Sequence, residues 1–82
     1  MTNKQFKNQY IDMNDYAFLK GYGQVQRRHI VLVKNEIMEA LGLKARNNWY
    51  FRLYGKIEPK ISEAKAIEDI FKKYGITDIW GR

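Results

Sequence analysis

Apolar residues between positions 28 and 42 recur at the spacing of one helical face. They are Ile30, Val33, Ile37, Met38 and Leu41. Steps of three and four residues place such positions on one stripe of a helix, and Gly42 is a natural stop after its last turn. We predict an amphipathic helix here. Its start is ambiguous, because the β-branched run HIVLV is also compatible with extended chain.

A second stripe follows Pro59. It comprises Ala64, Ile67, Ile70, Phe71 and Tyr74. Ser62 is a suitable N-cap, and Glu63 then lies in the positive first turn. We expect this helix to end at Gly75 with Ile76 in a Schellman-type motif. Thr77 is a candidate cap for one last turn, DIWG, that would lay Ile79 and Trp80 on the core.

A shorter and more mixed helix is predicted between these two, from Arg46 or Asn47 to Tyr54, with its stop at Gly55. Its inward side would carry Trp49 or Tyr50 together with Leu53. Its outward side would carry four polar residues: Arg46, Asn47, Asn48 and Arg52.

The first 24 residues have the weakest pattern. Asn14 is a candidate cap for a short helix through DYAFLK. The segment GYGQV lacks the third glycine of a dinucleotide-binding loop, and we interpret it as a flexible turn. The expected organisation is an N-terminal arm or short helix over residues 1–24 and one domain over residues 25–82. The predicted class is all-α: a compact bundle of four to five short helices with an irregular N-terminal segment.

Composition favours one small globular domain. The 82 residues are 45% apolar and 29% charged, and they include no cysteine. Disulfides and thiolate zinc sites are therefore excluded, and a small folded domain without disulfides is ordinary in a reducing cytoplasm. No apolar run approaches the roughly 20 residues of a membrane span, and the N-terminus has no secretory h-region. We expect a cytoplasmic protein without a membrane partner.

The positive charge is concentrated in the middle of the chain. Residues 25–60 hold eight basic and three acidic side chains, a net charge of +5 out of a total of +6. A local basic excess is typical of a protein that binds a polyanion. The alternative is a solvated surface that only keeps the protein soluble.

The inventory of reactive side chains is small. His29 is the only histidine and Ser62 the only serine, so no Ser/His/Asp triad can form if Ser62 caps a helix. Glu36 and Glu39 lie three residues apart on a polar helix face, where carboxylates are usually solvated. We therefore do not expect an enzyme, a metal site, a cofactor or a small-molecule substrate.

The short middle helix carries side chains that can read DNA bases. In the major groove, arginine hydrogen-bonds guanine O6 and N7, and asparagine bonds adenine N6 and N7. We predict base contacts by Arg46, Asn47, Asn48 and Arg52. The alternative is that Asn47 only caps the helix and that Arg52 pairs with a glutamate.

The order of these elements resembles the lambda-repressor-like, Xre-type helix-turn-helix domains. The segment NEIMEALGL corresponds to a scaffold helix, NNWYFRLYGKIEP to a recognition helix and its loop, and SEAKAIEDIFKKYGI to the next helix. Gly42, Leu43, Gly55, Lys56 and Pro59 match the family's turn and loop positions. Twelve residues separate Gly42 from Gly55, one more than is usual in the family, so the turn or the start of the recognition helix holds an extra residue.

This resemblance implies sequence-specific binding of double-stranded DNA by a small, repressor-like transcriptional regulator. Phosphate contacts would come from Arg27, Arg28, Lys44, Lys56 and Lys60. We favour a homodimer on DNA, because one helix-turn-helix reads only a few base pairs. Its interface could use Phe6, Tyr10, Phe18 or Trp80, each of which could instead be core.

Two other functions stay open at this point. The first is binding of single-stranded RNA or DNA, in which Tyr50, Phe51 and Tyr54 would stack on bases. The second is a protein-interaction module on the same fold, in which the basic helix binds an acidic partner.

Overall fold

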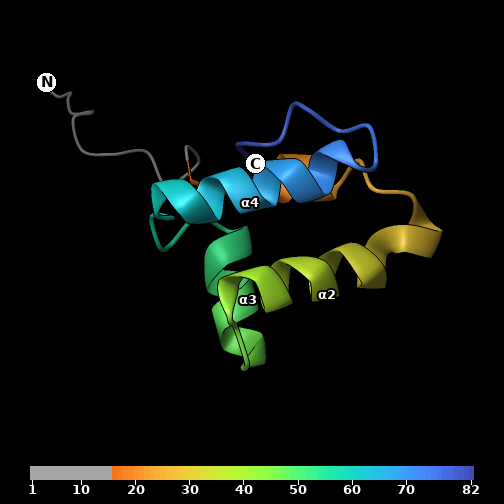
Figure 1. The fold of residues 1–82 in the computed structure, drawn as a ribbon. Helices are drawn as coiled ribbons and strands as arrows, with labels where there is room; N and C mark the ends of the chain where they lie inside the picture. Colours follow the sequence, from red (N-terminus) through yellow and green to blue (C-terminus); the bar gives the residue numbers. More distant parts are fainter. Residues whose placement is uncertain (1–15) are drawn as a thin grey trace, which may run out of the picture.

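The computed structural model describes residues 16–82 and contains, in that range, four α-helices and one 3-10 turn (Figure 1). The elements are α1 (Leu19–Tyr22), the 3-10 turn η2 (Arg27–His29), α2 (Ile30–Leu41), α3 (Arg46–Leu53) and α4 (Ile61–Lys72). The predicted all-α bundle is confirmed. Within the same residues, no helix has both the length and the apolar content needed to cross a membrane.

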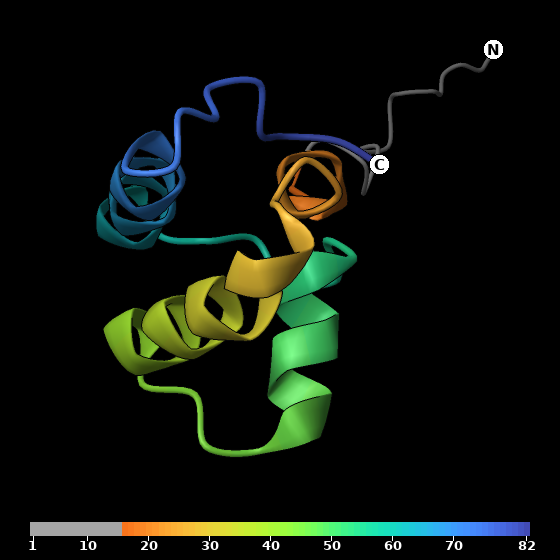
Figure 2. The same cartoon turned by 90° about the vertical axis from the view of Figure 1, so that its right-hand side faces the viewer.

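Helices α2 and α4 run antiparallel and pack along their length, while α3 crosses them (Figures 1 and 2). The predicted stripe of α2 faces this contact: Val33 and Ile37 are buried, and the other three apolar residues pack partly buried against the core. Ile67, Ile70 and Phe71 of α4 are buried as predicted. The period of about 3.6 residues therefore identified both long helices correctly.

A glycine with a left-handed backbone conformation follows each of the helices α2 and α3 and ends it. Gly42 has φ +69° after α2, and the Leu43 N–H donates to the Met38 carbonyl at 2.8 Å. Gly55 has φ +79° after α3, and the Lys56 N–H donates to the Phe51 carbonyl at 2.8 Å. Both are Schellman-type endings, which glycine makes at low cost. The predicted ending after α4 is also confirmed, because the Ile76 N–H donates to the Phe71 carbonyl at 3.1 Å.

The predicted N-cap of α4 is wrong by two residues. Lys60 holds the cap position and Ser62 lies inside the helix. The reason is Glu63, whose Oε1 accepts the Lys60 backbone N–H at 2.9 Å and so satisfies a free donor at the helix start.

The C-terminal residues pack on the core, but the predicted last helical turn is wrong. Residues 76–79 are non-helical, and Ile79 is 4% exposed. Their backbone instead pairs with the segment around α1. The Gly21 N–H donates to the Ile79 carbonyl at 3.0 Å, and the Gly81 N–H donates to the Ala17 carbonyl at 2.7 Å. Contacts between distant parts of the chain therefore replace the local helix.

Residues 16–24 belong to the same core as the later helices. Phe18 is 1% exposed and meets the rings of Trp49, Phe71 and Trp80 at centroid distances of 5.6, 6.2 and 6.3 Å. It is therefore a core residue and not a surface for a dimer. Phe6 and Tyr10, the other N-terminal candidates, lie outside the described residues.

Of two local predictions for this segment, the Asn14 cap stays a prediction and the turn at residues 21–25 needs correction. The proposed cap Asn14 lies outside the described residues, and the described helix begins only at Leu19. The expected turn GYGQV is correct only in part, because Gly21 and Tyr22 belong to α1 and Gly21 is buried, whereas residues 23–25 form a turn.

Gly21 lies against Ile79 so closely that a side chain has no room. A Cβ atom there would lie 3.0 Å from the Ile79 Cα. We expect Gly21→Ala to lower the free energy of unfolding by about 1–3 kcal/mol, because overpacking against backbone outweighs the gain in helix propensity. Urea denaturation measures the free energy of unfolding of the variant and the parent protein. Gly23→Ala is the control: Gly23 is exposed, so a change below about 1 kcal/mol is expected. Equal losses would contradict the close contact with Ile79.

Candidate nucleic-acid interface

Helix α3 is anchored by one buried edge. Trp49 and Leu53 are 2% and 3% exposed, as predicted. The Trp49 ring contacts Phe18 and Tyr22 edge to face, with centroids 5.6 and 5.2 Å away. Lys34 of α2 places its Nζ 5.8 Å from the Trp49 ring centre. These contacts fix the rotation of α3 about its axis, and so decide which side chains face solvent.

The N-terminal half of α3 presents Arg46, Asn47 and Asn48 to solvent. Within residues 16–82, their side chains make no hydrogen bond or ion pair. In particular, no side chain caps the start of α3, so the alternative role of Asn47 as a cap is not observed. The turn and this end of α3 lie far from the C-terminus of the chain (Figure 2). Three of the four predicted base-reading residues therefore share one free surface.

Arg52 does not face outward as predicted. Its Nη1 lies 2.9 Å from Oε1 of Glu63, and the two side chains are only 15% and 18% exposed. Its Nη2 approaches the other carboxylate oxygen at 3.4 Å, which makes the contact nearly bidentate. The alternative considered from sequence, a pair with a glutamate, is what the structure contains. Arg52 holds α3 against the start of α4.

This pair predicts a pH dependence of stability. Hydrogen bonds from Arg52 and from the Lys60 N–H lower the pKa of Glu63. A lowered carboxyl pKa gives stability that is present above the unfolded value of about 4.3 and lost as pH falls through the folded value. We expect Glu63→Gln, which can still cap α4, to be about 1 kcal/mol less stable at pH 7. The difference should shrink as pH falls below about 4.3 and vanish below the folded pKa of Glu63, as measured by denaturation at each pH.

Glu58 offers the matched control. It is exposed, and none of the described residues pairs with it. Glu58→Gln should therefore match the parent protein at every pH. A difference between Glu63→Gln and the parent that stays constant across this range would contradict the ion pair as its cause.

The five predicted phosphate-contacting residues are all exposed. Arg27 and Arg28 lie in η2, Lys44 lies in the turn before α3, and Lys56 and Lys60 lie in the loop after it. In the described part of the chain, none of the five forms an ion pair. Arg28 donates only to the side chain of Gln26, at 3.1 Å. These cations therefore stay available to an anion from outside.

The starts of α2 and α3 lack side-chain compensation for the helix dipole, although the first N–H of α2, that of Ile30, donates to the Arg27 carbonyl of η2. Neither has a side-chain cap or an acidic residue in its first turn. Instead, η2 places Arg27 and Arg28 before α2, and Lys44 and Arg46 flank the start of α3. Positive side chains at the positive end of a helix dipole are unfavourable unless an anion lies nearby. Helix α4, by contrast, has Glu63 in this position.

Most acidic side chains are bound to other parts of the protein. Glu36 accepts from Lys73 at 2.5 Å and from the Tyr74 hydroxyl at 2.6 Å, and these bonds, Lys73 first, lower its pKa. Asp69 and Asp78 pair with Lys65 and Lys20, and Glu68 accepts from Trp80. Since these carboxylates have partners on α4, α1 and the C-terminal segment, they do not neutralise the basic residues around α3.

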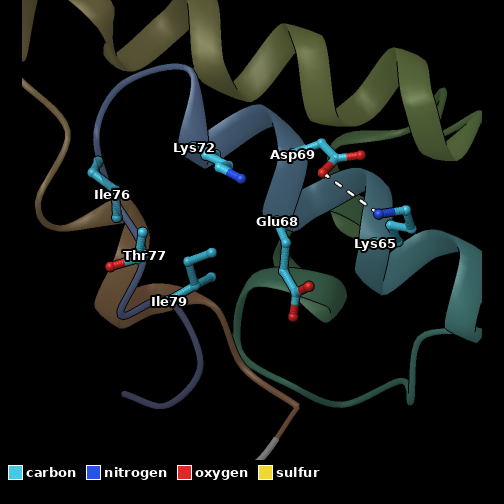
Figure 3. Close-up of a pocket in the computed structure, with 7 residues that line it drawn as sticks. All are labelled: Lys65, Glu68, Asp69, Lys72, Ile76, Thr77 and Ile79. Atoms are coloured by element: carbon cyan, nitrogen blue, oxygen red, sulfur yellow. Dashed lines mark ion pairs between the residues drawn. The ribbon is translucent and has the colours of Figure 1, made fainter.

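The groove between α4 and the C-terminal segment has no excess of basic over acidic side chains. It has a volume of about 430 Å³, and two lysines and two acidic residues line it beside Ile76, Thr77 and Ile79 (Figure 3). Lys65 and Asp69 pair across one turn of α4 at 4.0 Å. No group of three metal-ligating side chains occurs in the described residues. The charged residues that line the groove balance to no net charge, and they form no group of metal-ligating side chains.

The expected inward position of Tyr50 is wrong. It is 42% exposed, and its ring stacks on Tyr54 with centroids 6.3 Å apart. Phe51 is 40% exposed beside it. For Phe51 the sequence contained the signal, because a helical residue two positions from both Trp49 and Leu53 must point away from them. The free surface of α3 is therefore partly aromatic and not only polar.

Comparisons with known proteins do not add an assignment. No family model, no curated protein and no solved structure matches this chain. The function is therefore inferred from α3 and the basic residues around it.

Proposed function

We propose that this protein binds double-stranded DNA sequence-specifically, with α3 in the major groove. One observation carries the proposal: Arg46, Asn47 and Asn48 are all exposed in the first turn of α3 and have no partners in the described chain. In the groove, arginine is suited to guanine and asparagine to adenine. Arg52 is left out of the base-reading set, because Glu63 occupies it.

The dimensions of the unit suit this role. Helix α3 has eight residues, a length of about 12 Å, and the major groove is about 12 Å wide. Helix α2 precedes it across a four-residue turn, and α3 runs across α2 (Figure 1). We propose that α2, residues 42–45 and α3 act as a helix-turn-helix in which α2 spans the DNA backbone.

The basic residues outside α3 would then hold the protein on the two DNA strands. Arg27 and Arg28 lie at the start of α2, about 18 Å along that helix from the turn that carries Lys44. Lys56 and Lys60 follow α3 in the loop to α4. Contacts of this kind fix the register of a helix in the groove but carry no sequence information. The uncapped start of α3 would gain phosphate oxygens as partners.

This activity suits a small transcriptional regulator, without catalysis or a cofactor. A homodimer on a palindromic site would extend the few base pairs that one α3 can read. Trp80, one of the side chains considered for that interface, is partly buried against the core and bonded to Glu68. The proposal for DNA does not depend on the dimer.

The exposed aromatic residues of α3 favour one second candidate, single-stranded nucleic acid. Tyr50 and Phe51 could stack on unpaired bases, which need no particular sequence. We prefer duplex DNA, because Asn47 and Asn48 would have little use on a stacking platform. An acidic protein partner would use the same cations but would require no base chemistry.

The salt dependence of binding to duplex DNA tests the proposal. With five phosphates neutralised, log K is expected to fall with log salt concentration at a slope of roughly −4 to −5. Fluorescence anisotropy with a labelled duplex measures it. A single strand of the same sequence should compete poorly. A slope near zero would rule out the phosphate contacts, and equal competition by the single strand would favour the second candidate.

A further inference from the structure

The centre of the exposed face of α3 is Phe51. Trp49 and Leu53 define the buried side, and at 100° per residue Phe51 points almost directly away from their midpoint. Asn47 lies one turn earlier on the same line, while Asn48 and Tyr50 flank it. A helix placed in a groove by its buried edge would therefore direct Asn47 and Phe51 at the groove floor.

Phe51 has no role inside the described protein. It is 40% exposed, lies outside the core cluster and makes no ring contact with residues 16–82. Cations that lack ion pairs surround its helix, and no acidic residue is present within α3. An apolar side chain at the centre of a cationic face suits a partner that is anionic at its edges and apolar at its floor.

In the major groove, the apolar group on the floor is the 5-methyl group of thymine. We infer that Phe51 contacts this methyl group while Asn47 hydrogen-bonds adenine, so that α3 recognises A·T base pairs at the centre of its site. The inference rests on the proposed function. Asn47 and Phe51 are separated by about 6 Å along the helix axis, less than two steps of about 3.4 Å between base pairs. The two contacts therefore fall within about two base-pair steps of each other.

Replacing thymine by uracil removes this methyl group and leaves the base-pairing edge unchanged. The probe is the duplex that the full chain enriches from a random pool, prepared once with thymine and once with uracil. We expect the parent protein to bind the uracil duplex about fourfold more weakly for each methyl group contacted, the effect of losing one buried methyl-sized group. Phe51→Ala should bind both duplexes equally.

The controls separate failure of this inference from failure of the proposed function. Ile61→Ala truncates a side chain that is 90% exposed on α4, and it should keep the full preference for thymine. If the parent binds both duplexes equally, or if Phe51→Ala retains the preference, the Phe51 contact is wrong while duplex binding stands. An enriched site without A·T pairs would also overturn the inferred contact between Phe51 and thymine. Failure to enrich any duplex would overturn the proposed function and this inference with it.

Discussion

Phe18→Ala is expected to lower the free energy of unfolding by about 3–5 kcal/mol, the range found for large aromatic residues removed from a core. Phe18 is 1% exposed and touches three other aromatic rings from α3, α4 and the C-terminal segment. Small domains are stable by only about 5–15 kcal/mol, so the variant should melt more than about 10 °C below the parent. Thermal denaturation followed by circular dichroism measures this.

Phe51→Ala is the matched control for this prediction, because it removes the same atoms from a side chain that is 40% exposed. Phe51→Ala should lower the free energy of unfolding by less than about 1 kcal/mol. Equal losses for the two variants would show that Phe18 does not join α1 to the rest of the core. A large loss for Phe18→Ala alone would support one domain that includes residues 16–24, whereas the sequence had suggested a boundary after residue 24.

Arg46→Ala and Asn47→Ala are expected to weaken binding to a cognate duplex by roughly 5- to 150-fold each, the usual effect of losing one good base contact. Both side chains are exposed and have no partner in residues 16–82, so neither variant should change the melting temperature appreciably. Binding to a duplex of unrelated sequence should weaken less, because base contacts contribute little there. Anisotropy titrations on both duplexes separate the two effects.

Lys72→Ala controls for charge alone. Lys72 is exposed on α4, forms no ion pair in the described chain and lies at the groove of Figure 3, away from α3. Lys72→Ala removes the same unit charge as Arg46→Ala, and we expect it to change the affinity for the cognate duplex by no more than about twofold. If Lys72→Ala and Arg46→Ala weaken binding equally, the position of Arg46 on α3 has no special role.

The helices could be predicted because local patterns determine them. The stripe from Ile30 to Leu41 and the stripe from Ile67 to Phe71 each repeat at helical spacing, and glycines stop both helices. The exposure of Asn47 and Asn48 followed from the burial of Trp49 and Leu53 in the same helix, whereas Arg46, three residues before Trp49, is exposed as the first residue of α3. The same reasoning, carried one step further, would have placed Phe51 outward.

The features that depend on contacts between distant residues could not be predicted from the sequence. The C-terminal segment departs from a helix because Ile79 and Gly81 pair with Gly21 and Ala17, about sixty residues earlier. Arg52 lies at the border of the buried edge of α3, where periodicity alone does not decide its direction. Its long side chain turns toward Glu63 of α4, and the packing of α3 against α4 decides this.

Selection from a random pool of duplexes with the full chain tests sequence-specific DNA binding most directly. We predict enrichment of a short motif that contains A·T base pairs, and a palindromic motif would also report the dimer and its half-site spacing. The Arg46→Ala variant should enrich a weaker or altered motif. Recovery of no motif from repeated rounds, despite a folded protein, would contradict the account.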